Sequence, residues 1–219
     1  MRLYRFVSAE NGLRSIRDRR LRIGRIEELN DDFEFLGIAL DLKDDRIALR
    51  KMRKLISETK GVICMSDDWS SPLMWAHYAD SHKGMVLGLE VPEGAFTKVD
   101  YVEERPTLAS MGLSQFGDLT EAQMSKLIMM KAKGWEYEHE FRAFTKLKDA
   151  VTLHGQVHYF FPIGAGMDLR EVIVGSRFQT ERAEVERAVG DLADVDLYMA
   201  RGDFEEFKVV RQHQDSMWR

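Results

Sequence analysis

Acidic side chains recur at every second position in one short stretch, residues 135–142. These are Glu136, Glu138 and Glu140, and Arg142 takes the next alternate position. In an extended chain, side chains two residues apart lie on one face of a strand, about 7 Å apart. Carboxylates at that spacing repel each other. Two interpretations are open: a charged, solvent-facing strand edge that discourages aggregation, or a strand that presents carboxylates to a positively charged or hydroxyl-rich ligand.

The residues between these charges favour a strand over residues 135–144. They place a mostly aromatic set, fit for a hydrophobic core, on the opposite face: Trp135, Tyr137, His139, Phe141 and Ala143. The acidic face is therefore the strongest candidate site in the chain. Its candidate partners come from earlier segments and are Tyr4, Arg5, Trp75, His77 and Tyr78.

Several familiar kinds of site are not encoded. The sequence has no phosphate-binding loop and no glycine-rich dinucleotide fingerprint. His77 and His82 are near each other, but no cysteine or carboxylate spacing completes a zinc site, so no metal is expected. Ser66 lacks the flanking glycines of a nucleophile elbow. Cys64 is interpreted as a buried structural thiol rather than a nucleophile.

Length and composition limit the class of protein. The chain has 219 residues, of which 44% are hydrophobic and 32% are charged, enough to bury a core. No apolar run reaches membrane-spanning length, and the N-terminus lacks a signal-peptide apolar core. The single cysteine excludes an internal disulfide and fits a reducing cytoplasm. We therefore expect a cytoplasmic protein without membrane contact.

Hydrophobic periodicity and helix-cap residues predict an alternation of short strands and helices. Strands are expected at residues 3–6, 21–23, 61–66, 85–90, 98–102, 135–144, 157–161, 172–174, 195–199 and 207–210. Helices are expected after Ser8 and at residues 41–57, 72–79, 121–133 and 180–189. Repeats and linkers are not found. The simplest account is a single α+β domain with a central mixed or split β-sheet and flanking helices.

Three segments are expected to be irregular, and they are residues 28–34, 105–119 and 211–219. The first is a polar turn anchored by Leu29 and Phe33, in which Asn30 or Asp31 could cap a helix. The second could be a mobile flap, and the third is expected to be frayed.

Basic residues gather at two places in the first sixty residues. One set is Arg17, Arg19, Arg20, Arg22 and Arg25, and the other lies along the helix expected at residues 41–57 and comprises Arg46, Arg50, Lys51, Arg53 and Lys54. Each set could be a solvated face, and the first could instead be an anion-binding wall. The helical set could bind nucleic acid or an acidic partner. It lacks the interleaved aromatics of a stacking platform, which favours solvation.

Four motifs, in this order, resemble the domain-of-unknown-function family numbered 2971. They are Leu3-Tyr4-Arg5-Phe6, Leu29-Asn30-Asp31-Asp32-Phe33-Glu34, Met74-Trp75-Ala76-His77-Tyr78-Ala79-Asp80 with His82-Lys83-Gly84, and Trp135-Glu136-Tyr137-Glu138-His139-Glu140-Phe141-Arg142. Residues 170–175 add a match near the end, so the resemblance covers nearly the whole chain. Asp32 departs from the family, which usually has proline there; the change should alter the turn more than any chemistry.

The motif order is also similar to that of ADP-ribosyltransferases, especially bacterial toxins that modify nucleic acid. Those proteins begin with a strand that carries His or Arg near a Tyr, and they place a catalytic glutamate at the start of a late strand, often in a Glu-x-Glu string. Tyr4-Arg5 and Glu138-His139-Glu140 are similar to these two elements. The resemblance implies an ADP-ribosyltransferase-like fold, NAD as co-substrate, and a nucleic acid or protein as acceptor, in a toxin or defence effector.

The same resemblance implies a role for each candidate residue. Glu140 would stabilise the positive charge that develops on the ribose as nicotinamide leaves, and Glu138 would orient or activate the acceptor. Arg5 would pair with the pyrophosphate. Tyr78 or Trp75 would stack on the nicotinamide ring. The remaining residues expected in the cofactor site are Tyr4, Asn30, His77 and Arg142.

Other functions remain open. The carboxylates and Arg5 could bind a nucleotide or an amino-containing ligand without turnover, or the basic faces could recognise nucleic acid. Affinity for nucleic acid would fall steeply with salt, whereas a small-ligand pocket would respond weakly. A purely structural role is also open, in which Glu140 forms an internal salt bridge with Arg142 or Arg5.

Overall fold

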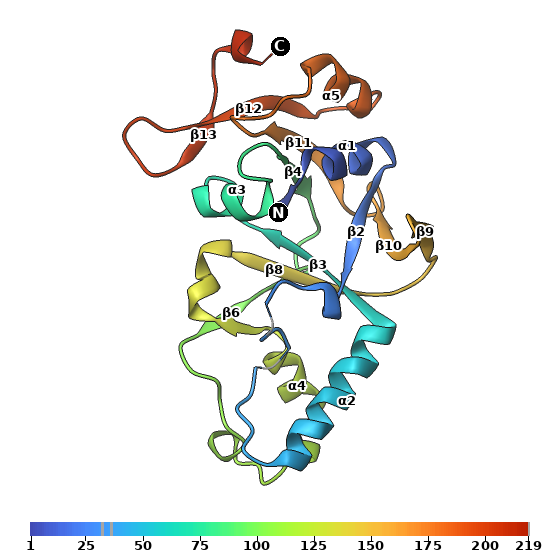
Figure 1. The fold of residues 1–219 in the computed structure, drawn as a ribbon, viewed down its shortest axis with the longest axis vertical. Coiled ribbons are helices and arrows are strands. Elements are labelled where there is room, and N and C mark those ends of the chain that lie inside the picture. Colours follow the sequence, from blue (N-terminus) through green and yellow to red (C-terminus); the bar gives the residue numbers. More distant parts are fainter. Residues whose placement is uncertain (32, 36, 219) are drawn as a thin grey trace.

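The computed structural model describes residues 1–31, 33–35 and 37–218 and shows strands and helices in alternation (Figure 1). The strands are β1 (Arg2–Val7), β2 (Arg20–Arg25), β3 (Lys60–Ser66), β4 (Met85–Glu90), β5 (Thr97–Lys98), β6 (Asp100–Val102), β7 (Met130–Ala132), β8 (Glu140–Lys146), β9 (Val151–Leu153), β10 (Gln156–Pro162), β11 (Asp168–Val174), β12 (Asp196–Gly202) and β13 (Val209–Arg211). The helices are α1 (Ala9–Arg17), α2 (Lys43–Thr59), α3 (Pro72–Tyr78), α4 (Glu121–Leu127) and α5 (Arg182–Val189). Short 3-10 helices lie at Ile26–Glu28, Ala109–Met111, Phe116–Asp118, Lys133–Glu138 and Asp215–Met217.

Eleven of the described strands form one mixed sheet. Its order is β13-β12-β11-β4-β1-β3-β2-β10-β9, with β8 paired to β3 and β5 paired to β8. β11 and β12 run parallel, whereas β4 is antiparallel to both of its neighbours. A separate parallel pair, β6 and β7, lies with α2 and α4 at the lower end of the molecule in Figure 1. The prediction of one α+β domain with a mixed central sheet is confirmed.

Local sequence signals set the helix starts as expected. Ser8 and Ser71 each accept a hydrogen bond at Oγ from the backbone N–H three residues later, and Pro72 takes the first position of α3. Thr120 and Gln123 form the predicted reciprocal capping box of α4. In the described part of the chain, every helix is too short or too polar to cross a membrane.

The sheet is split beside β3. β8 occupies one edge of β3 along its whole length, so β1 and β2 share the other edge. β1 pairs there only at Tyr4 with Ser66, and β2 pairs near the opposite end, at Gly24 with Val62. Between these points the carbonyl of Cys64 accepts a hydrogen bond from the Arg5 guanidinium. β1 and β2 therefore diverge along β3 and leave a fork between them.

The core lies on both faces of β4, at the centre of the sheet. Leu87 belongs to a buried cluster with Ile16 of α1 and Val185 of α5. Val86 faces the other side and belongs to a cluster with Trp75 of α3. Because successive strand residues point to opposite faces, this apolar strand needs cover on both sides, and helices provide it.

The predicted strand over residues 135–144 is wrong in its first half. Lys133–Glu138 forms a 3-10 helix, and β8 begins only at Glu140. His139 joins the two with a positive φ of 48°, which turns the chain sharply. Of the aromatic residues expected to form a core face, His139 is exposed and the others are only partly buried. In contrast, Glu138, Glu140 and Arg142 are buried. The charged face, expected to be exposed, is therefore the buried one, because Lys131 and Glu34 form ion pairs with it.

The helix predicted at residues 121–133 ends earlier than expected. α4 stops at Leu127, and the chain continues into β7, which pairs in parallel with β6. Lys131, expected in a helical last turn, instead lies in this strand and is buried. Pairing with β6 and burial of the lysine among carboxylates override the local preference for helix.

Smaller expectations also need correction. Phe33 is 61% exposed, and the buried anchor of its turn is Phe35. The described residues of that turn, Asn30 and Asp31 among them, cap no helix, and Asp32 lies outside the described residues. The C-terminal segment is not frayed throughout, because the Trp218 ring is buried and its Nε1 donates to the Thr180 carbonyl at 3.0 Å.

Candidate functional site

A cavity of about 270 Å³ opens at the fork between β1 and β2, against β3. Its wall includes six of the nine residues predicted to form the site, and these are Tyr4, Arg5, Asn30, Tyr78, Glu138 and Glu140. They come from β1, from the turn after β2, from α3, and from the junction between the 3-10 helix Lys133–Glu138 and β8. The fork therefore brings together residues that are far apart in the sequence.

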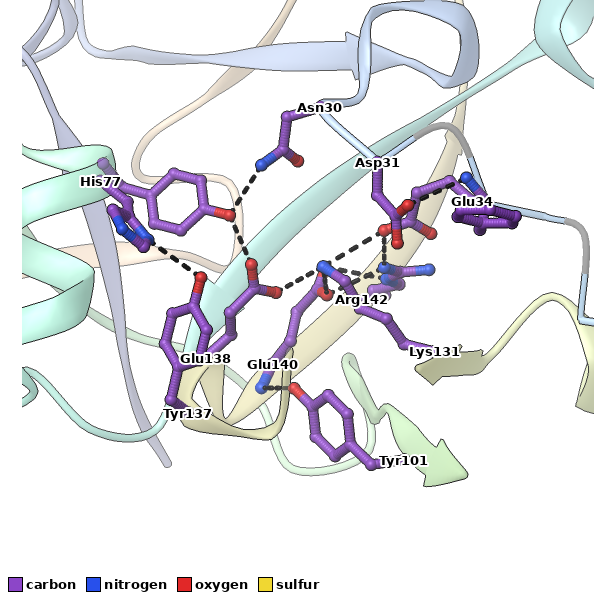
Figure 2. Close-up of polar contacts among 12 residues, drawn as sticks. Asn30, Asp31, Glu34, His77, Tyr101, Lys131, Tyr137, Glu138, Glu140 and Arg142 are labelled. Carbon is purple, nitrogen blue, oxygen red and sulfur yellow. Dashed lines mark hydrogen bonds and ion pairs between the residues drawn. The ribbon is translucent and has the colours of Figure 1, made fainter. Parts of the chain in front are cut away.

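A buried network of five charged side chains lies against the cavity, and all of them except Arg142 line it (Figure 2). Arg142 donates through Nε and Nη2 to the two oxygens of Glu140, both at 2.8 Å, and through Nη2 to Glu34 at 2.6 Å. Lys131 Nζ lies 3.1 Å from Glu140 and 3.2 Å from Glu34, and it also donates to Glu138. None of these side chains is more than 6% exposed. Three carboxylates share two cations, so one negative formal charge remains when all five are ionised.

Glu138 connects this network to the mouth of the cavity. The Tyr78 hydroxyl donates to Glu138 Oε1, and the Asn30 side-chain amide donates to the Tyr78 oxygen at 2.8 Å. Figure 2 shows Asn30 and His77 on the opposite side of Glu138 from Lys131 and Arg142. A chain of hydrogen bonds thus runs from the exposed Asn30 to the buried charges.

The two neighbouring carboxylates have different proton affinities. Burial raises the pKa of Glu138, and the attraction of Lys131 only partly offsets this. Burial would also raise the pKa of Glu140, but the hydrogen bonds and charge of Arg142, with the charge of Lys131, lower it to about 2. Glu140 is therefore ionised at any physiological pH, and Glu138 is the member of the pair that exchanges a proton more readily.

Cys64 lines the same cavity and is only partly buried, which corrects the expectation of a buried thiol. Burial, with the nearby Glu140 carboxylate, raises the pKa of its thiol well above the usual range. Because the thiolate is the reactive form, we expect the native protein to react with a disulfide reagent such as DTNB at least ~10-fold more slowly at pH 8 than the urea-unfolded chain. Equal rates in the two states would contradict the raised pKa of the Cys64 thiol.

Three predicted residues do not line the cavity. Trp75 has no exposed surface, packs edge-on against Phe6 with ring centroids 5.7 Å apart, and donates from Nε1 to the Trp69 carbonyl at 2.7 Å. It is therefore a core residue, and the expected stacking on a ligand is corrected. Arg142 lies behind Glu140 with no exposed side-chain surface. His77 is exposed, and its Nδ1 lies 3.0 Å from the Tyr137 hydroxyl.

The sequence interpretation missed two members of the charged network. Lys131 was expected in an ordinary helix end, and Glu34 was noticed only within a turn motif. Tyr101 was also missed; its hydroxyl accepts a hydrogen bond from the backbone N–H of Glu140 at 2.8 Å and so holds the start of β8. A lysine flanked by Met130 and Ala132 offers no local signal of ion pairing. An excess of carboxylates near Arg142 was the only available sign that another cation was needed.

Comparison with known proteins does not assign a family or a function to this site. No family model matches the chain, no curated protein matches it, and no solved structure matches its fold. The resemblance to the family numbered 2971 stays a prediction made from the motifs, and the candidate site rests on the cavity and the charged network that lines it.

Proposed function

We propose that the protein is an NAD-dependent ADP-ribosyltransferase that transfers ADP-ribose to a nucleic acid or protein, as a toxin or defence effector would. One observation supports this above all: Glu138 and Glu140 line one cavity, and their pKa values are moved in opposite directions. Cleavage of a glycosidic bond commonly uses such a pair, one carboxylate staying charged and the other exchanging a proton. The motif resemblance to ADP-ribosyltransferases points the same way.

The network suits the charge changes of this reaction. The bond between the ribose carbon and the nicotinamide nitrogen breaks, and its electron pair leaves with nicotinamide, which becomes neutral. The ionised Glu140, in a network with one uncompensated negative charge, stabilises the positive charge left on the ribose. An oxygen or nitrogen of the acceptor then bonds to that carbon, and its proton passes to Glu138.

In this proposal Arg5 holds the diphosphate of NAD. Its guanidinium is bound to the Cys64 carbonyl at the fork and lines the cavity. That contact fixes the orientation of the side chain, while its other N–H groups can donate to phosphate oxygens. The contact therefore reduces the entropy that binding would otherwise cost.

The direct test is incubation of the purified protein with NAD labelled in its adenylate half, in the presence of cell extract. We expect release of nicotinamide and transfer of the label to a macromolecule. Digestion of the labelled material with nuclease or with protease then identifies the acceptor class. If neither free nicotinamide nor transferred label exceeds the level of a boiled sample, the proposed activity is refuted.

A binding module without turnover is the second candidate. It is favoured by the mutual pairing of all five charges in the network, which holds the wall of the cavity rigid without a ligand. In that case NAD or a related nucleotide would stabilise the protein against heat, and nicotinamide would not be released.

A further inference from the structure

A second cavity of about 270 Å³ lies on the other side of the fork, between α1, β1, β2 and β10. Its lining is strongly basic and includes Arg5, Arg14, Arg20, Arg22 and His158. Among the described residues that line it there is no carboxylate. Arg5, Phe6 and Tyr78 line both cavities, so the two share a wall at the fork.

The basic side chains are held in place from outside this cavity. Each of three arginines pairs with a carboxylate that is not part of the lining: Arg14 with Glu10 at 2.7 Å, Arg20 with Asp18 at 2.8 Å, and Arg22 with Glu28 at 2.9 Å. A single carboxylate uses only part of the five-donor guanidinium. The pairs therefore orient the arginines and leave donors for a further anion.

Two buried nitrogen atoms at this cavity have no partner among the described residues. They are Nε of Arg20 and Nδ1 of His158. The Arg20 guanidinium also lies over the Phe160 ring, 4.0 Å from its centroid, which fixes its plane. Both atoms have almost no exposed surface, so a ligand in the cavity would instead bond to the other guanidinium nitrogens of the partly exposed Arg14, Arg20 and Arg22.

We propose that the second cavity binds the diphosphate of a nucleotide whose ribose and leaving group occupy the first cavity. Arg5, on the shared wall, would contact the ligand where it passes from one cavity to the other. Because Arg5, Phe6 and Tyr78 border both cavities, one extended ligand would reach from one to the other. This inference rests on the proposed function for the identity of the whole substrate, but diphosphate binding can be measured without turnover.

The test is isothermal titration of the full chain with ADP and with inorganic pyrophosphate at low salt. The variant carries Arg20→Gln and Arg22→Gln, which leave Arg5 unchanged. Its matched control is Arg17→Gln, because Arg17 is an exposed arginine of α1 that pairs with Glu184 outside this cavity. We expect both ligands to bind the wild type and the control equally, and the double variant roughly 10- to 100-fold more weakly, since each charge-assisted hydrogen bond is worth about tenfold. Circular dichroism and a thermal melt confirm that the variant is folded.

Two results would overturn the inference: no binding of ADP or pyrophosphate to the wild type, or equal binding to the wild type and the folded double variant. The inference would also be overturned if ADP does not bind but a single-stranded oligonucleotide does, and if its binding depends on Arg20 and Arg22. That result would indicate a nucleic-acid-binding surface. If ADP binding depends on these arginines but NAD is never consumed, the proposed function fails and the diphosphate site stands.

Discussion

The Glu138→Gln protein is expected to remain folded and to consume NAD at least ~100-fold more slowly than the wild type, which is the lower range for loss of a general acid–base group. Glutamine keeps the shape and can still accept the Tyr78 hydrogen bond, but it cannot take a proton from the acceptor. The loss should appear in kcat rather than in KM, because Glu138 acts on the transferred proton. Nicotinamide release at saturating NAD measures it.

The free energy of unfolding should fall less in this variant than when Arg142 is replaced, because Lys131 keeps Glu34 and Glu140 as partners. Burial raises the pKa of Glu138, so ionisation of this carboxyl opposes folding. The stability that the protonated carboxyl contributes is fully present below its unfolded pKa and is lost as pH rises through its folded pKa. A neutral amide avoids this penalty, but with its oxygen toward Tyr78 it turns its N–H2 group toward the Lys131 ammonium and loses that ion pair. The matched control is Glu136→Gln in the same 3-10 helix, because Glu136 is exposed and pairs only with exposed Lys133 among the described residues, at 2.7 Å. Equal kcat in both variants and wild type would exclude Glu138 as the proton-exchanging group.

The Arg142→Met protein is expected to lose about 3–5 kcal/mol of unfolding free energy at pH 7, as when one partner of a buried ion pair is removed. Methionine is of similar length and fills the space, but Glu34 and Glu140 then share only Lys131. Urea unfolding followed by circular dichroism measures the loss. In a protein of ordinary stability this is a large fraction of the total.

The pH dependence of the unfolding free energy provides a second test of the ion pair between Glu140 and Arg142. The pKa of the Glu140 carboxyl is about 2 in the folded protein and about 4.5 in an unfolded chain. Because its folded pKa is lowered, its contribution is fully present above pH 4.5 and is lost as pH falls toward 2. This lowering of the Glu140 pKa corresponds to about 3 kcal/mol of unfolding free energy. The difference in unfolding free energy between the wild type and Arg142→Met should therefore become smaller as pH falls from 4.5 toward 2.

The control for Arg142 is Arg170→Met, because Arg170 forms a partly exposed pair with Asp168 at 3.4 Å. An exposed pair of this kind contributes about 0–1 kcal/mol. If both substitutions destabilise the protein equally, or if the Arg142 effect is independent of pH between 4.5 and 2, the network does not stabilise the fold in the way its geometry indicates.

Much of the fold was predictable because local signals and tertiary contacts agree. Ser8, Ser71 with Pro72, and Thr120 with Gln123 begin helices where their side chains can satisfy free backbone N–H groups. Apolar runs such as the one in β4 became central strands. These features depend on residues within one turn or one strand, so a single sequence contains the information.

The chain by itself determined which side chains are available for the site: the alternate acidic residues near position 138, the Tyr4-Arg5 pair, Asn30 and Tyr78. It did not determine which of them face a cavity, because that depends on the fork between β1 and β2. It also did not reveal that Lys131 lies in a strand rather than a helix and pairs with Glu34, Glu138 and Glu140. Burial of charge is favourable only when distant partners converge, and that convergence exists only in the tertiary structure.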